Sequence, residues 1–296
     1  MLTNRRLSIL YFLNLIKWDA LAIFSYTLII GMTDNLPHLR DIRIPITLAA
    51  LVGTLLSLLL GFRTAQSYER WWEARNIWGS IVNDSRTFVR QMMQFLPATP
   101  AKQKEIQELA IRQYIWCFAL ANTMRKCPMP SNVQEYIDAN GIGDTSNLPN
   151  RLLTAHGEQL FRISEDFKLD DNKQVQLDST LQRLTDSMGR CERIKNTVFP
   201  RSYSLLIHFL IYVLMTILPF GLEHNNPIVE IFISTLIPLL FIAIERTAIL
   251  MQDPFENKPT DTPMTALSQT IERNLREMSG LRPVDGPPPL ETYYQM

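Results

Sequence analysis

The chain has 296 residues, 46% of them hydrophobic, and its 29 basic side chains are balanced by 29 acidic ones. This balance, and the lack of a basic patch interleaved with aromatic residues, argue against nucleic-acid binding. Apolar residues gather in blocks near both ends while the middle third is polar, so the near-zero mean hydropathy is the sum of a membrane part and a soluble part.

The first apolar block follows a basic start, Met1 to Leu7, that superficially resembles a signal peptide. No small-x-small cleavage site precedes a polar mature start, so we expect a retained first span. Ile9 to Met32 is long enough to cross a bilayer but carries Lys17 and Asp19. We therefore expect its first turns to lie along the interface and only the later part, from Ala20, to be fully immersed.

The second block, Ile44 to Phe62, contains no charged residue and ends sharply at Gly61, Phe62 and Arg63, so it is the clearest predicted span. Residues 61–75 continue this helix into a cluster of arginine, glutamate and tryptophan. One interpretation is an interfacial belt at headgroup level, with charge pairing along the helix around Glu69 and Glu73. A second interpretation adds a pore to that belt.

The central segment, residues 63–198, is too long and too patterned to be a loop. Apolar residues recur at three- and four-residue steps in Trp71–Trp78, Ile106–Met124 and Leu177–Val198, which predicts a helical domain. Pro128 to Asn150 is predicted to be a loop, because its prolines and glycines break any longer element.

The third and fourth blocks are predicted spans at Tyr203–Leu222 and Pro227–Leu250. In the fourth, we interpret Glu245 and Arg246 as marking the end of the helix. The tail, residues 256–296, has a polar amphipathic stretch at Thr265–Met278 and then prolines that favour an extended end.

Orientation follows from the basic residues after the second block and in the tail. By the positive-inside rule they place both termini and the central segment in the cytosol, which gives a 2 + 2 topology. Cysteines in that compartment stay reduced, and the three here have no CxxC spacing. We expect them to be plain buried residues: Cys117, Cys127 and Cys191.

No catalytic signature is present. Four dispersed histidines form no HExxH pair, and there is no P-loop, GxSxG or GxGxxG motif, so we predict no metal, no cofactor and no enzymatic activity. A membrane enzyme would need intramembrane acid–base groups that face each other. The candidates for such groups are His208, Glu230, Glu245 and Arg246.

Three places in the sequence resemble the bestrophin family. They are Ile44-Pro45 with Gly61-Phe62 and then Arg70-Trp71-Trp72; Phe199-Pro200 with Tyr203-Ser204; and Asp253-Pro254-Phe255. Each motif alone is moderately specific, but their order and separation together are specific. The resemblance covers about residues 5 to 260.

The resemblance implies an all-α polytopic membrane protein with four transmembrane helices and a helical cytosolic domain within residues 1–255. It also implies a homopentamer around a central pore. The second span would line this pore, with a neck at Thr54, Leu58 and Phe62 and with Arg70, Trp71 and Trp72 supporting the pore helix. A hydrophobic constriction can empty of water and stop ions. The alternative is that Leu58 and Phe62 pack against neighbouring helices.

Two further positions follow from the resemblance. A cytosolic aperture falls at Asn172, although Asp170 to Asn172 is equally consistent with a helix N-cap. Animal members bind calcium after the Asp-Pro-Phe motif, but here residues 256–261 offer too few carboxylates for a six- to eight-oxygen site. We therefore expect no calcium activation.

The expected function is an ion channel in the bacterial inner membrane that passes small monovalent ions. An uncharged neck leaves anion or cation selectivity to charges at the mouths, among them Asp34, Arg40, Asp41, Arg43, Asp170 and Asp171. The alternative is a membrane-anchored helical scaffold that binds a cytosolic partner and conducts nothing.

Overall fold

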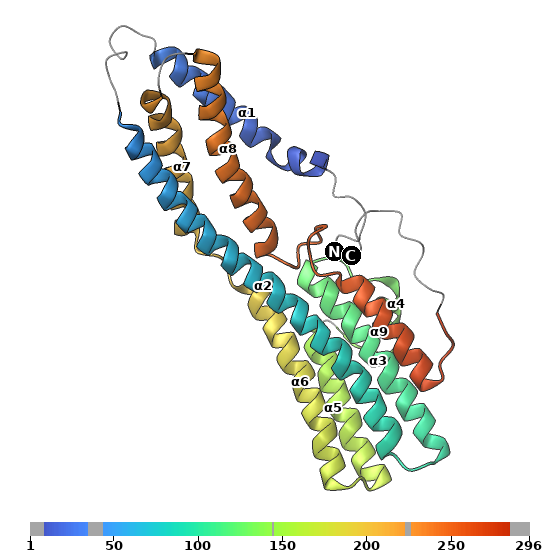
Figure 1. The fold of residues 1–296 in the computed structure, drawn as a ribbon. Coiled ribbons are helices and arrows are strands. Elements are labelled where there is room, and N and C mark those ends of the chain that lie inside the picture. Colours follow the sequence, from blue (N-terminus) through green and yellow to red (C-terminus); the bar gives the residue numbers. More distant parts are fainter. Residues whose placement is uncertain (1–8, 35–43, 144, 223–225, 285–296) are drawn as a thin grey trace. The chain divides into compact units, whose positions relative to one another are not determined.

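The computed structural model describes residues 9–34, 44–143, 145–222 and 226–284, and these residues form helices and no strand (Figure 1). The fold is all-α, as the sequence predicts. The helices are α1 (Ile9–Asp34), α2 (Ile46–Phe95), α3 (Pro100–Arg125), α4 (Ser131–Ala139), α5 (Leu148–Phe167), α6 (Asp171–Asn196), α7 (Arg201–Gly221), α8 (Pro227–Gln252) and α9 (Met264–Ser279).

The chain divides into two compact units, each described by itself. The apolar unit comprises residues 5–70 and 198–252, and the polar unit comprises residues 71–197 and those from Asp253 onward. Helix α2 contributes its first half to the apolar unit and its second half to the polar unit. It does not end with its apolar block at Phe62 but continues to Phe95.

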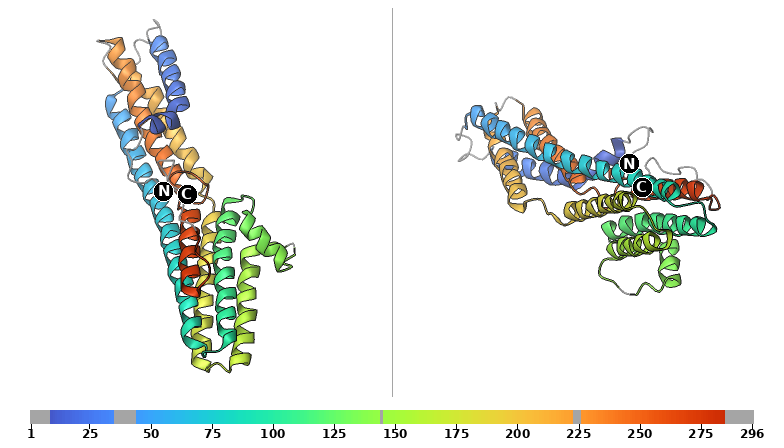
Figure 2. Two further views of the ribbon diagram at one scale, coloured as in Figure 1. Left: turned by 90° about the vertical axis from the view of Figure 1, so that its right-hand side faces the viewer. Right: turned by 90° about the horizontal axis from the view of Figure 1, so that it is seen from below.

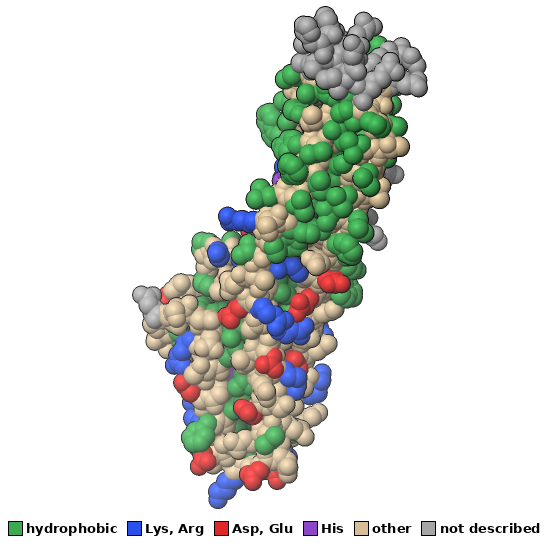
Figure 3. Space-filling view, turned by 90° about the vertical axis from the view of Figure 1, so that its left-hand side faces the viewer, with side chains coloured by type: hydrophobic (Ala, Val, Ile, Leu, Met, Phe, Trp, Pro, Cys, Tyr) green, Lys and Arg blue, Asp and Glu red, His purple; other side chains and the backbone are tan. Residues whose placement is uncertain are grey.

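Four helices, α1, α2, α7 and α8, are long and apolar enough to cross a membrane. They leave large apolar side chains on the outside of the apolar unit, among them Leu51, Leu205 and Ile228. Figure 3 shows hydrophobic side chains gathered over this unit, while charged side chains are dispersed over the polar unit. So much exposed apolar surface is typical of a protein that contacts lipid or other subunits.

Polar contacts join the helices of the apolar unit, where lipid gives little hydrophobic drive for helix association. Pro238 in α8 has no amide hydrogen to donate to the carbonyl of Ser234 one turn earlier. The hydroxyl of Thr27 from α1 approaches that carbonyl at 3.5 Å. The side chain of a neighbouring helix thus replaces the bond that the proline removes.

The polar unit is a bundle in which α3 packs against α5 and α9, and α5 packs against α6 (Figure 2). Its core is apolar and includes the fully buried rings of Trp78, Phe88 and Trp116. Helix α9 belongs to this unit, and Arg276 of α9 donates to the hydroxyl of Tyr114 on α3 at 3.0 Å. The amphipathic stretch expected in the tail is therefore a helix packed on the bundle.

The predicted loop at residues 128–150 is wrong, because α4 forms within it and α5 begins at Leu148. Two of the three prolines that indicate a loop lie at helix starts. Pro130 is the N-cap residue of α4, and Pro149 lies in the first turn of α5. A proline at a helix start costs nothing, because the first amide groups have no partner within the helix.

Candidate functional site

The three predicted neck residues lie on one exposed face of α2 in the apolar unit. Leu58 is 57% exposed and Phe62 is 59% exposed, and Thr54 is exposed one turn earlier. The opposite face of the same turns is buried and presents Leu56 and Leu60 to the core. The neck residues therefore do not pack inside their own subunit.

Thr54 differs from the two apolar neck residues that follow it, Leu58 and Phe62, by its hydroxyl group. That hydroxyl donates to the carbonyl of Ala50 at 2.9 Å, and Ser57 bonds in the same way to Gly53. The hydroxyl hydrogens are used within the helix, so they are not available as donors to a passing ion.

A buried ion pair lies behind the neck. Nη1 of Arg63, the residue after Phe62, is 2.9 Å from Oε1 of Glu245 on α8. Nε2 of His208 on α7 is 2.9 Å from the other carboxylate oxygen, Oε2. Both side chains of the Arg63–Glu245 pair are almost fully buried, while that of His208 is 43% exposed. One carboxylate thus joins three helices.

The interpretation of Glu245 and Arg246 as a helix end is wrong, because α8 continues to Gln252. Arg246 forms a bidentate ion pair with Asp19 of α1. Its Nε donates to Oδ2 at 2.8 Å, and its Nη2 donates to Oδ1 at 2.7 Å. Charges inside such a helix are accommodated because each faces a partner within the protein.

The structure also brings together some of the acid–base groups considered for a membrane enzyme. His208 and Glu245 face each other, whereas Glu230 lies in the first turn of α8. Both oxygens of Glu245 are already engaged, one by Arg63 and one by His208. The arrangement cross-links helices, and both oxygens of Glu245 serve as acceptors in it.

Two of the predicted support residues bond to the last residue of α8 and to the chain that follows it. Within the apolar unit, Nε of Arg70 donates to the carbonyl of Gln252 at 2.9 Å. Within the polar unit, Nε1 of Trp71 donates to the carbonyl of Thr260 at 2.8 Å. Trp72 is 49% exposed, and its ring centroid is 6.2 Å from that of Trp71.

The charge pairing of Glu73 runs between helices. The carboxylate of Glu73 lies 3.1 Å from Arg193 and 3.5 Å from Arg190, both on α6. The expected pairing along the helix around Glu69 and Glu73 therefore misses the cationic partners of Glu73.

The loop after Asp253-Pro254-Phe255 is closed by a carboxylate. Asp261 is 1% exposed, and its Oδ2 accepts the backbone amides of Glu256 at 2.6 Å and Lys258 at 3.1 Å. Burial raises the pKa of Asp261, and the two backbone hydrogen bonds oppose that rise. The described residues contain no cluster of three or more side chains suited to hold a metal ion.

Asn172 is exposed in the first turn of α6. Oδ1 of Asp170 accepts its backbone amide at 3.1 Å, so Asp170 is the N-cap of this helix. The capping interpretation is confirmed, and the aperture at Asn172 stays a prediction. Of the charges expected at the mouths, Arg40, Asp41 and Arg43 lie outside the described residues.

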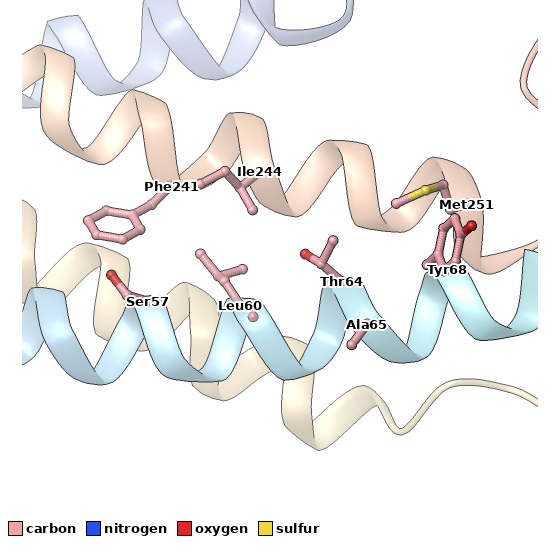
Figure 4. Close-up of a pocket in the computed structure, with 9 residues that line it drawn as sticks. Ser57, Leu60, Thr64, Ala65, Tyr68, Phe241, Ile244 and Met251 are labelled. Atoms are coloured by element: carbon pink, nitrogen blue, oxygen red, sulfur yellow. The ribbon is translucent and has the colours of Figure 1, made fainter.

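An open apolar cavity of about 540 Å³ lies between α2 and α8 in the apolar unit. Figure 4 shows Ser57, Leu60 and Thr64 of α2 pointing toward α8, from which Phe241 and Ile244 face them. Small residues on this side of α2, Gly61 and Ala65, leave it open. A groove of this kind in an apolar unit accepts a hydrocarbon chain or another helix.

Comparison with known proteins identifies the family. Residues 9–277 match the family model described as "Bacterial/Fungal Bestrophin protein". The chain belongs to this bestrophin family. It is 30% identical over 267 residues to the voltage-dependent anion channel-forming protein YneE of Salmonella typhi, covering 88% of this chain and 86% of that protein. It is 29% identical over 280 residues to the protein of the same name from Escherichia coli, covering 93% and 91% of the two chains.

A solved bestrophin structure agrees with the fold. The crystal structure of a bacterial bestrophin homolog from Klebsiella pneumoniae superposes with a TM-score of 0.82 at 28% identity, covering 90% of this chain and 100% of that one. The bestrophin match, the named relatives and the apolar helices make this chain a membrane protein of a channel family and not an enzyme.

Proposed function

We propose that this bestrophin forms a homopentameric channel in which α2 of each subunit lines a central pore. The observation that carries the proposal is the exposed face of α2 with Thr54, Leu58 and Phe62. Exposed apolar residues four positions apart on a helix form a continuous stripe. One four-span subunit cannot enclose a pore. The stripe can line a pore when several subunits are arranged around a common axis.

The neck would work as a hydrophobic gate for small monovalent ions. Rings of Leu58 and Phe62 favour an empty constriction, and a slight outward movement of the helices admits water and ions. The names of the relatives support anions as the permeant species. Without charges in the neck, this preference would be set at the mouths, where Asp170 and Asp171 begin α6 and Asn172 forms a cytosolic aperture.

The channel would lie in the bacterial inner membrane with both termini in the cytosol and without calcium activation. The Asp261 loop supports the last point, because this carboxylate accepts two backbone amides of its own loop. Hard cations need six to eight oxygen ligands, which this short loop does not supply. We expect the current to be the same in a chelator and in about 1 mM calcium, a concentration in the binding range of even the weakest protein calcium sites.

The test is ion flux through purified protein in planar bilayers under a salt gradient, with the subunit number measured by native mass spectrometry. We expect a pentamer and a reversal potential whose sign shows anion preference. The opposite sign would replace anions by cations. A silent protein of lower subunit number would overturn the channel and favour a membrane-anchored scaffold with a cytosolic partner.

A further inference from the structure

We infer that His208 is a proton-binding site that acts on the pore helix through Glu245 and Arg63. The inference rests on the proposed function, because its effect is a change in channel current. Three observations carry it: the contacts that join these side chains, the balance of charges around them, and the attachment of α7 to the neck.

The contacts form a continuous path from the outside of the subunit to the neck. The side chain of His208 is 43% exposed on the outside of the subunit, and its Nε2 contacts Glu245 at 2.9 Å. The other oxygen of Glu245 contacts Arg63 at 2.9 Å. Since Arg63 directly follows Phe62, a change at the imidazole reaches the gate residue through two polar contacts.

The charges around His208 are balanced when the imidazole is neutral. On α8, Glu245 is paired with Arg63 of α2, and Arg246 is paired with Asp19 of α1. Lys17 of α1 is exposed and lies over the ring of Trp18. The two ion pairs thus cancel within the packed helices, while Lys17 carries its charge on the exposed side of α1. A protonated His208 adds one positive charge per subunit that this set does not compensate.

Protonation of His208 also changes how strongly Glu245 interacts with each of its two partners. A neutral imidazole donates an ordinary hydrogen bond, whereas an imidazolium competes with Arg63 for the same carboxylate. The charge of Arg63 beside the neck is then less well neutralised. A more positive potential near a narrow pore raises the local concentration of anions and lowers that of cations. Histidine is the side chain that ordinarily changes charge between pH 5 and 8.

Helix α7 is attached to the same turns of α2 at a second point. The hydroxyl of Tyr203 donates to the carbonyl of Leu59 at 2.8 Å, next to neck residue Leu58. The ring of Phe199 lies 5.0 Å from the guanidinium of Arg63. A shift of α7 after protonation of His208 therefore acts directly on the gate.

The experiment measures anion current through wild-type channels in planar bilayers at pH 7.5 and pH 5.5. We expect acidification to raise the current about two- to tenfold, the range expected for one partly screened charge per subunit. His208→Gln keeps an N–H donor but cannot gain a charge, so its current should stay low at both pH values. His208→Lys carries a fixed charge, so its current should be high at both.

The chain offers a control in His156, which is fully buried in the polar unit. His156→Leu should keep the full pH response. Only variants with the wild-type subunit number by native mass spectrometry are compared, and either His208 variant decides alone. A pH response that survives in His208→Gln or His208→Lys, or a wild-type current that is the same at both pH values, overturns the inference while the channel stands. Absence of wild-type current at both pH values overturns the proposed function instead.

Discussion

The guanidinium of Arg63 and the carboxylate of Glu245 lie 2.9 Å apart, and neither side chain is more than 2% exposed. Removing one partner leaves a buried charge without its counter-ion, which costs about 3–5 kcal/mol. We expect Arg63→Met or Glu245→Leu alone to lower the thermal unfolding temperature strongly in detergent. The double variant should recover most of the loss, because two apolar side chains need no counter-ion.

The control for this pair is Arg151 with Glu158, which are also 2.9 Å apart but are 43% and 60% exposed. Breaking that exposed pair with Arg151→Met should change stability by less than about 1 kcal/mol. A similar small effect at Arg63 would show that the buried pair does not stabilise the apolar unit.

The neck assignment predicts a gain of conductance. Replacing Leu58 and Phe62 together by Ala removes the large apolar side chains and with them the barrier to wetting. We expect larger single-channel currents than in the wild type. Leu205→Ala is the matched control, because Leu205 is equally apolar and is 68% exposed on α7. Equal currents in the wild type and the double variant would remove Leu58 and Phe62 from the gate.

The apolar blocks could be predicted because a run of about 20 hydrophobic residues is a local signal. The ion pairs between residues far apart in the sequence could not be predicted. From the sequence, Arg63 marks the charged end of its span, since nothing near it in the sequence reveals a carboxylate on another helix. Glu245 marks a helix end in the sequence for the same reason. The sequence does not predict α4, because proline breaks helices in their interior, whereas Pro130 is an N-cap.

The three cysteines should differ in reactivity. Burial raises the pKa of both Cys117 and Cys191 to about 12, so neither is a thiolate at pH 8, whereas Cys127 is half-buried. We expect a maleimide to label one thiol per native subunit and three after denaturation, counted by mass spectrometry. Cys127→Ser should bring the native count to zero, and labelling of Cys117 or Cys191 in the native protein would contradict their burial.

His156 gives the polar unit a pH-dependent stability. It is fully buried against Phe88, and desolvation, aided by the nearby charge of Arg112, holds its pKa well below 6.5. The unfolded chain therefore binds a proton more readily than the folded one. Stability should be complete above pH 6.5 and fall by about 1.4 kcal/mol per pH unit below it, until the folded pKa is reached.

The measurement for His156 is the unfolding temperature in detergent at pH 7.5, 6.5 and 5.5. His156→Leu cannot take up a proton and should lose less stability between pH 6.5 and 5.5 than the wild type. The carboxylates titrate alike in both proteins, so the difference reports the imidazole. Equal losses would show that His156 is not kept neutral by the fold.

The separation of Arg63 from Glu245 along the chain has a consequence for biosynthesis. The apolar unit is split by residues 71–197, so α2 is synthesised long before α7 and α8. At about 5–20 residues per second, Glu245 leaves the ribosome roughly 10–35 s after Arg63. During that interval Arg63 lacks the carboxylate that pairs with it in the folded chain, and we expect it to stay in the headgroup layer. We therefore expect the last span to complete the insertion of the second one, so that nascent chains stopped before α8 leave α2 less deeply inserted than full-length chains.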